Sequence, residues 1–217
     1  MTDRRRTLPA ATDPADPRHI GRSYESVVRV DSQSGKSGVA HLLKSSHGLD
    51  LPRPTRIDFA RRVQRIADRE GAEPTAADLR ALFDSCYLTP PETAPQLKEF
   101  HVEEADGRVT LGALVIDPTG HATRLLGAGP TPAAAHTAAL TAADRTVTLD
   151  SLHTHPDPAG AGCVAYVRIT TDGRTGFGAG IDTDPAAAQL TAVTNATADA
   201  RAAADPSTDK ERTCAFS

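Results

Sequence analysis

Two short stretches of the chain carry side chains that could do chemistry, and the first is a pair of histidines. A strand-like run ends in His153-Thr154-His155-Pro156. Two imidazoles and a carboxylate can hold a zinc ion and leave one position for water, which permits metal-assisted hydrolysis. The serine and aspartate that such a site needs downstream are missing, because their positions fall within 162–166. Two exposed histidines in a loop are the favoured interpretation, and Asp157 or Cys163 as a third ligand is a weak alternative.

The second stretch resembles a phosphate-binding loop. It reads Ser34-Gly35-Lys36-Ser37, and a lysine beside backbone amides of this kind can cradle phosphates. The first glycine of that motif would fall at position 30, which is Val30, so a solvated turn is the favoured interpretation. No serine, cysteine or threonine stands in a nucleophile motif. The residues themselves therefore predict no catalytic group, metal or cofactor.

The composition is that of a globular protein with a core of small side chains. Of the 217 residues, 39% are hydrophobic, 24% are charged and 4% are aromatic, without tryptophan. Alanine and small aliphatic residues must therefore fill the core, and the length suits two small domains better than one large domain. The net charge of -4 gives no electrostatic reason to expect nucleic acid or an anionic membrane as a partner.

Cysteine usage and hydropathy bear on the compartment. Cys86, Cys163 and Cys214 are odd in number and have no paired spacing, which favours reduced thiols. No apolar segment approaches ~20 residues and no apolar run follows the basic start, so neither a membrane span nor a secretory signal is expected. We expect a cytoplasmic protein.

The elements that must position any site fall into two groups, and the first precedes residue 96. Residues 1–20 are expected to form a flexible arm, because prolines interrupt them and they lack hydrophobic periodicity. β-Branched and apolar residues predict strands at 26–30 and 39–43. Apolar residues at helical spacing predict an amphipathic helix over 57–67. A second helix is expected to start at Thr75, with Asp78 completing a capping box.

The second group of elements repeats a pattern of three strands and a helix. Each copy contains Gly-Ala-Gly, then a proline, then three alanines, at 127–135 and again at 178–188. The glycines would let a strand turn tightly into a helix, whose free amides could receive a carboxylate. The expected strands are Glu99–Glu104, Arg108–Ile116, Ala122–Leu126, Thr146–Leu152, Val164–Thr170 and Thr175–Gly178, and the expected helices are Thr131–Ala143 and Pro185–Ala203.

These elements predict an α+β protein made of a small strand/two-helix subdomain and a duplicated βββα domain. The expected boundaries are a flexible arm at 1–20, a linker-type subdomain at 21–95, the duplicated domain at 96–205 and a tail at 206–217. One helix covers only one face of a small sheet, so each unit must bury its remaining apolar surface against its twin or another subunit. Self-association is therefore expected.

Four linked motifs resemble the 2-isopropylmalate synthase family. They are Gly21–Glu25, Arg29–Ala40, His47–Arg53 and Ile57–Phe59, and they follow one another in the family's order. They are similar to the small subdomain that follows that family's catalytic barrel, and the duplicated βββα half is similar to its regulatory domain.

The resemblance leaves out the part that performs the family's reaction. That reaction condenses acetyl-CoA with 2-oxoisovalerate on a divalent metal inside a (β/α)8 barrel, which needs ~250 residues. The 217 residues have no room for such a barrel. The family also supplies a histidine and a tyrosine to the active site from the segment just before the Asp-Pro that leads into Gly-Arg, and neither residue occurs within Leu8–Pro14. No catalytic role is therefore carried over.

The resemblance also implies an effector site. In the family, leucine binds between two regulatory domains and inhibits the distant barrel. The family commonly has asparagine at the position of Ala128 and tyrosine near Ser151, and these departures would weaken or redirect amino-acid recognition. The matching effector positions are Gly127, Ala128, Gly129, Pro130, Thr131, Thr148, Ser151, Ala161 and Cys163.

We therefore expect a detached regulatory or dimerisation module that forms a homodimer and acts in leucine biosynthesis or a related 2-oxo-acid chain extension. It would bind leucine or a related small amino or oxo acid, or dock onto a separately encoded synthase barrel. One alternative is a divergent acyltransferase component that needs a separate barrel subunit. Another is a vestigial scaffold without a ligand.

Overall fold

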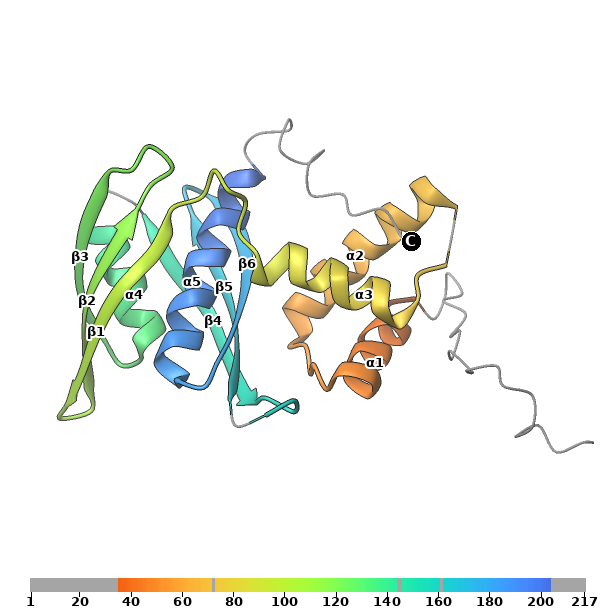
Figure 1. Ribbon diagram of the computed structural model, residues 1–217, viewed down its shortest axis with the longest axis horizontal. Helices are drawn as coiled ribbons and strands as arrows, with labels where there is room; N and C mark the ends of the chain where they lie inside the picture. The colour runs from red at the N-terminus through yellow and green to blue at the C-terminus, as the bar shows by residue number, and fades with distance from the viewer. Residues whose placement is uncertain (1–34, 72, 144–145, 161, 204–217) are drawn as a thin grey trace, which may run out of the picture.

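A computed structural model describes residues 35–71, 73–143, 146–160 and 162–203 of the chain (Figure 1). The helices are α1 Gly35–His47, α2 Arg53–Glu70, α3 Ala76–Phe83, α4 Pro132–Ala142 and α5 Pro185–Ala202, with a π-helical turn η2 at Asp84–Leu88. The strands are β1 Gln96–Ala105, β2 Arg108–Ile116, β3 Ala122–Gly129, β4 Val147–Pro156, β5 Cys163–Thr171 and β6 Arg174–Asp182. The predicted α+β class is confirmed.

The segment Val39–Leu43 forms part of α1, so the prediction of a strand there is wrong. Val39, Leu42 and Leu43 are buried and lie three and four residues apart, the spacing of one helix face. Five residues are too few for hydrophobic periodicity to distinguish a strand from a helix. The arm at 1–20, the predicted strand at 26–30, Ala161 and the tail at 206–217 lie outside the described residues.

The other two helices before residue 96 agree with the sequence pattern. α2 buries Phe59, Ala60 and Val63 on one face. At the start of α3, Thr75 Oγ1 accepts a hydrogen bond from the Asp78 backbone amide at 3.2 Å, and Asp78 accepts one from the Thr75 amide at 2.8 Å. The predicted capping box is therefore confirmed.

The duplicated βββα pattern is confirmed in both copies. β1, β2 and β3 form an antiparallel sheet in that order, here called sheet A, and β4, β5 and β6 form the equivalent sheet B. β3, β4 and β6 run further than predicted, to Gly129, Pro156 and Asp182. Both Gly-Ala-Gly motifs and the two histidines of β4 therefore lie within strands and not in turns or loops.

The layers stack in the order sheet A, the pair α4 and α5, sheet B, and then α1–α3 (Figure 1). The core between the two sheets consists mostly of alanine, valine and leucine, as the composition predicted. β5 is buried on both faces: Ala165 and Val167 face α4 and α5, while Val164 and Tyr166 face α1–α3. A central strand covered on both sides accounts for the apolar run at 163–167.

The glycines of the two repeats allow each helix backbone to touch a strand. A Cβ atom on Gly178 would lie 2.3 Å from the Ala192 carbonyl oxygen, and one on Gly127 would lie 2.2 Å from that of Ala135. No side chain fits there, so the motif serves close helix–sheet packing and not the tight turn expected from the sequence.

Candidate functional site

Five of the predicted effector residues lie together where β3 leads into α4. Gly127, Ala128 and Gly129 end the strand, and Pro130 connects them to Thr131. Thr131 caps α4, because its Oγ1 accepts a hydrogen bond from the Ala134 amide at 3.1 Å. The inner side of Gly127 and Gly129 is filled by the α4 backbone, so a ligand could reach this segment only from the outer side or from the end of the helix.

The remaining predicted residues lie on the other sheet. Thr148 and Ser151 are exposed on β4, an edge strand, and pair with Thr170 and Arg168 on the outer face of sheet B. Cys163 begins β5 and packs partly into the core between the sheets, on the opposite face. The structure thus brings Gly127–Thr131 together but does not collect the predicted residues into one pocket of a single chain.

The histidines of β4 form a ring cluster with a buried tyrosine. His155 Nε2 lies 3.3 Å from the Tyr166 hydroxyl, and its Nδ1 lies 2.7 Å from the Pro156 carbonyl oxygen. The His153 ring stacks on Tyr166 at 6.4 Å between centroids. Burial raises the pKa of the Tyr166 phenol above its ordinary range. Among the described residues, no group of three or more His, Cys, Asp or Glu side chains could hold a metal ion.

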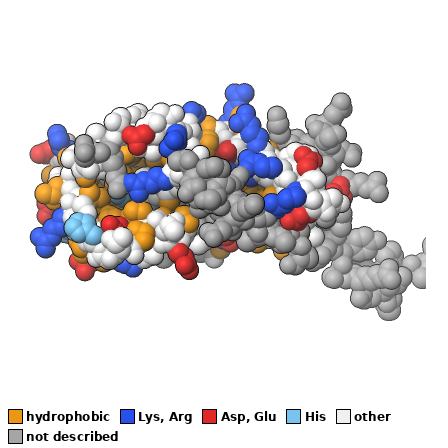
Figure 2. Space-filling view, turned by 90° about the horizontal axis from the view of Figure 1, so that it is seen from above, with side chains coloured by type: hydrophobic (Ala, Val, Ile, Leu, Met, Phe, Trp, Pro, Cys, Tyr) orange, Lys and Arg blue, Asp and Glu red, His pale blue; other side chains and the backbone are white. Residues whose placement is uncertain are grey.

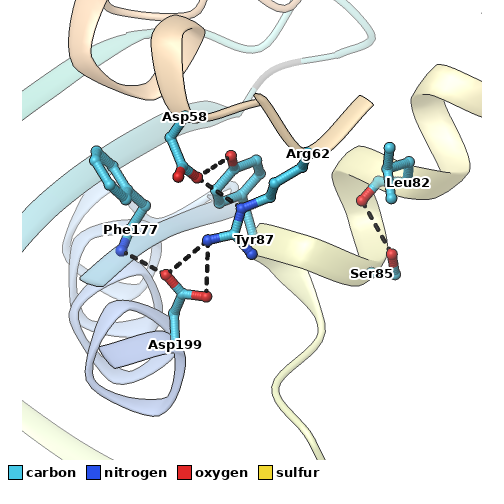
Figure 3. A network of polar contacts seen from close by, with 7 residues as sticks. All are labelled: Asp58, Arg62, Leu82, Ser85, Tyr87, Phe177 and Asp199. Carbon is cyan, nitrogen blue, oxygen red and sulfur yellow. Dashed lines mark hydrogen bonds and ion pairs between the residues drawn. The ribbon is translucent and has the colours of Figure 1, made fainter. Parts of the chain in front are cut away.

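A buried polar network joins α2 and η2 to α5 and β6 (Figure 3). Arg62 is its centre: Nε donates to Asp58 at 2.7 Å, and Nη2 donates to both carboxylate oxygens of Asp199 at 3.1 Å. The Tyr87 hydroxyl donates to Asp58 at 2.6 Å, and the Phe177 amide donates to Asp199 at 3.0 Å. The Asp199 side chain is only 5% exposed, so this ion pair is shielded from water.

Asn195, one helical turn before Asp199, extends this network. Its Nδ2 donates to the Ala179 carbonyl oxygen of β6 at 2.9 Å and to the Leu88 carbonyl oxygen of η2 at 3.0 Å. The sequence analysis missed both residues, because they lie inside a helix whose other inward residues are mostly alanine. Two polar residues spaced i, i+4 in such a helix were the available signal.

The described residues also line a partly open cavity of about 160 Å³ between sheet A, α4 and α5. None of the predicted effector residues lines it; its walls include Val115, Leu125, Leu140 and the buried His136. His136 is 1% exposed and its Nδ1 has no hydrogen-bond partner among the described residues. Burial lowers the pKa of His136 to about 4, against a smaller opposing effect of the Leu190 backbone.

Two of the three cysteines lie in the described part of the chain, and neither forms a disulfide there. Cys86 is buried in η2, and Cys163 is half-buried with its thiol pKa raised by burial. Among the described helices, none combines the length and the apolar character needed to cross a bilayer.

Comparisons with known families match both halves of the chain. Residues 3–44 match the model described as alpha-isopropylmalate synthase, post-catalytic domain-like. Residues 73–200, more than half of the chain, match the model described as LeuA allosteric (dimerisation) domain. The second range contains the six described strands, α4 and all of α5 except its last two residues.

Individual relatives agree with these models. The chain is 39% identical over 186 residues to the 2-isopropylmalate synthase of Mycobacterium leprae (strain TN), a match that covers 84% of this chain and 31% of that protein. It is 42% identical over 193 residues to that of Leifsonia xyli subsp. xyli, covering 84% and 32%. The chain thus spans about a third of the length of the curated relatives it matches.

The two family models follow one another along the chain: the post-catalytic model matches first, and the range of the second model contains the duplicated βββα sandwich. The second model alone matches more than half of the chain, at residues 73–200. The chain belongs to the LeuA allosteric (dimerisation) domain family, and it corresponds to the carboxy-terminal part of the 2-isopropylmalate synthases and not to their catalytic domain.

Proposed function

We propose that this chain is an effector-binding and self-association module of the 2-isopropylmalate synthase type, which acts in the cytoplasm in leucine biosynthesis or a related 2-oxo-acid chain extension. The observation that carries the proposal is the match of residues 73–200 to the allosteric (dimerisation) domain. Catalysis of the family's reaction would require a barrel supplied from outside these 217 residues. We propose a separately encoded synthase barrel as that partner.

We further propose that the effector is leucine or a related small amino or oxo acid, held between two copies. Gly127–Thr131 of one copy would meet Thr148 and Ser151 of the next. In favour of this arrangement, Thr148 and Ser151 are exposed, whereas the inner side of Gly127 and Gly129 is closed by α4. Such a ligand would place its carboxylate near the amino terminus of α4.

The proposed division of labour follows the two halves of the chain. Residues 21–95 would connect the module to a barrel, and residues 96–205 would bind the effector. The network around Arg62 and Asp199 would keep the two parts in one orientation, because it ties α2 directly to α5 at 3.1 Å. Movement at the effector site could then reach the connecting part as a rigid-body shift.

The test is the thermal midpoint and the mass of the full chain with and without millimolar leucine. A ligand present at ~100 times its dissociation constant adds ~2.7 kcal/mol to the stability of the folded state. We expect a raised midpoint with leucine and none with glycine, and a larger rise in Ala128→Asn, which restores the amide of the family pattern. A monomeric mass together with flat midpoints for leucine and its 2-oxo acid would contradict the proposal.

The partner barrel is tested separately. A 2-isopropylmalate synthase catalytic barrel without its own regulatory part should gain leucine-sensitive turnover of acetyl-CoA when this chain is added. An unchanged turnover and an unchanged mass of the mixture would contradict the docking role. Turnover by this chain alone would contradict the proposed division of labour.

A further inference from the structure

The outer face of sheet A is the one face of the two sheets that no other part of the described chain covers. The equivalent face of sheet B lies under α1–α3, where Tyr166 is 1% exposed and Ala179 is fully buried. Ala128, which occupies the place of Ala179 in the first repeat, is half-buried. In the second repeat this face is therefore covered and buried, whereas no element within the described residues covers the corresponding face of sheet A.

This uncovered face has an apolar middle. Leu126 is 75% exposed and pairs with Gly112, which has no side chain to fill the space beside it. Gly112 in turn pairs with His101 on β1, and Leu114 lies two residues further along β2 on the same face. A shallow depression lined by these residues lies on the sheet. Figure 2 shows hydrophobic side chains at the surface of this half of the molecule, between charged ones.

Charges of opposite sign flank the apolar middle. The register places Glu99 of β1, Leu114 of β2 and Arg124 of β3 in one row across the sheet. Glu99 and Arg124 are two strand spacings apart, about 10 Å, so Leu114 separates them within one chain. Both charged residues are exposed.

We infer that the outer face of sheet A is a self-association surface, which packs against the same face of a second copy of this chain. A twofold axis that runs parallel to β2 between the two sheets places β3 of one copy over β1 of the other and keeps every row opposite itself. Arg124 of each copy then faces Glu99 of its partner on both sides of the paired Leu114 residues. Leu126 of each copy faces His101 and closes the space over Gly112.

The size of the face sets the expected strength. Three strands of about eight residues measure roughly 14 Å by 26 Å, on the order of 400 Å² per copy. A standard protein interface buries ~800 Å² per partner, so the pairing should be reversible, with a dissociation constant on the order of micromolar or weaker. The contact leaves β4 free but covers the outer side of β3, so in such a dimer the effector would have to reach Gly127–Thr131 from the amino-terminal end of α4.

The test is sedimentation of the full chain at concentrations from ~1 to ~500 µM. The inference predicts a doubling of mass within this range, and Leu126→Glu should weaken that step at least tenfold. Glu99→Arg and Arg124→Glu should each weaken it, and the double variant should restore it, because the swap recreates opposite charges. Arg174→Glu, an exposed charge on β6, should have no effect.

The outcomes separate this inference from the proposed function. If Leu126→Glu stops at a dimer that still responds to leucine, both stand, and if it becomes monomeric, this face is the principal dimer contact. The inference is overturned, and the proposed function is not, if the wild-type chain forms a dimer and nothing larger and the Leu126→Glu and Arg124→Glu substitutions leave its mass unchanged. A wild-type monomer at every concentration overturns both. Variants that lower the thermal midpoint without changing the mass would show that the chain covers this face itself.

Discussion

At the scale of single residues, three of the buried polar side chains of the described chain are Asp199, Asn195 and His136. Asp199 and Asn195 are satisfied by partners on other elements. His136 is buried at the wall of a partly open cavity, and its Nδ1 has no hydrogen-bond partner among the described residues. Removing a partner leaves a buried polar group unsatisfied, which lowers stability, whereas burial disfavours the protonated and charged form of an imidazole.

His136 predicts an acid-sensitive stability. Its pKa is lowered from 6.5 to about 4 in the folded state, so the unfolded chain takes up the proton first as the pH falls. Stability from this group is complete above about pH 6.5 and is lost on the way down to about pH 4, by about 3 kcal/mol. Urea unfolding across this range should show a shallower pH dependence in His136→Leu. Equal slopes for the two proteins would contradict the burial argument.

Asp199 predicts a large effect of a single substitution. Asp199→Ala leaves the Arg62 guanidinium, whose side chain is 19% exposed, without its second carboxylate and removes the acceptor of the Phe177 amide. We expect a loss of about 3 kcal/mol in the free energy of unfolding. Arg80→Ala is the matched control. The Arg80 and Asp84 side chains of its ion pair are 34% and 38% exposed, so we expect this substitution to cost less than ~1 kcal/mol. Equal losses would contradict the role of burial.

At the scale of elements, the packing of helices on strands depends on glycine. Gly178→Ala would place a methyl group 2.3 Å from the Ala192 carbonyl oxygen and from the Ala196 amide nitrogen, both backbone atoms. We expect a loss of at least ~2 kcal/mol, because α5 must move away from β6. Gly38→Ala is the control: nothing lies within 4 Å of its added methyl group, and in α1 it should stabilise by up to ~1 kcal/mol. Chemical unfolding measures both, and a neutral Gly178→Ala would contradict close packing.

Local sequence signals predicted individual helices and strands better than they predicted how these elements pack on one another. The capping box at Thr75 involves atoms three residues apart, so the sequence carries all of it. The run at 39–43 is too short to show whether its period is that of a strand or a helix. Strand ends were predicted too early, because the glycines and Pro156 look like turn residues until their neighbours are known.

The sequence predicted the grouping of only those candidate site residues that are consecutive in the chain. Gly127–Thr131 are consecutive, and the structure keeps them together. Whether Thr148, Ser151 and Cys163 join them stays a prediction, since that depends on contacts between copies. The i, i+4 spacing of Asn195 and Asp199 was visible in the sequence, but their partners could not be predicted, because these lie more than a hundred residues away or across β6.

At the scale of the whole molecule, the two halves of the chain share a core. Tyr166 of β5 packs edge-on against Phe83 of α3 at 6.3 Å between centroids, and Val164 lies in the same cluster. The helices therefore cover a face of sheet B that would otherwise expose large apolar side chains. The apolar run at 163–167 in β5 was the sequence signal for this layer.

A shared core predicts a single unfolding transition. Calorimetry of the full chain should show one cooperative peak for 21–95 and 96–205 together, with equal calorimetric and van't Hoff enthalpies. Tyr166→Ala should lower the midpoint of that peak, because it removes a buried ring from the junction, at a cost of about 3 kcal/mol or more. Thr154→Ala, at an exposed position of the neighbouring strand, is the control. Two separate peaks, of which only one moves, would contradict the shared core.

The side chains of Asn195 and Asp199 have one more consequence, which concerns how this protein avoids uncontrolled aggregation. β6 is an edge strand, and exposed edges are templates onto which other chains can add strands. Here the Phe177 amide and the Ala179 carbonyl group, which belong to that edge, are occupied by α5. The opposite edge, β4, is interrupted by a bulge between Leu149 and Ser151. Sheet B is therefore protected against growth by strand addition, and copies of the protein can assemble through folded faces.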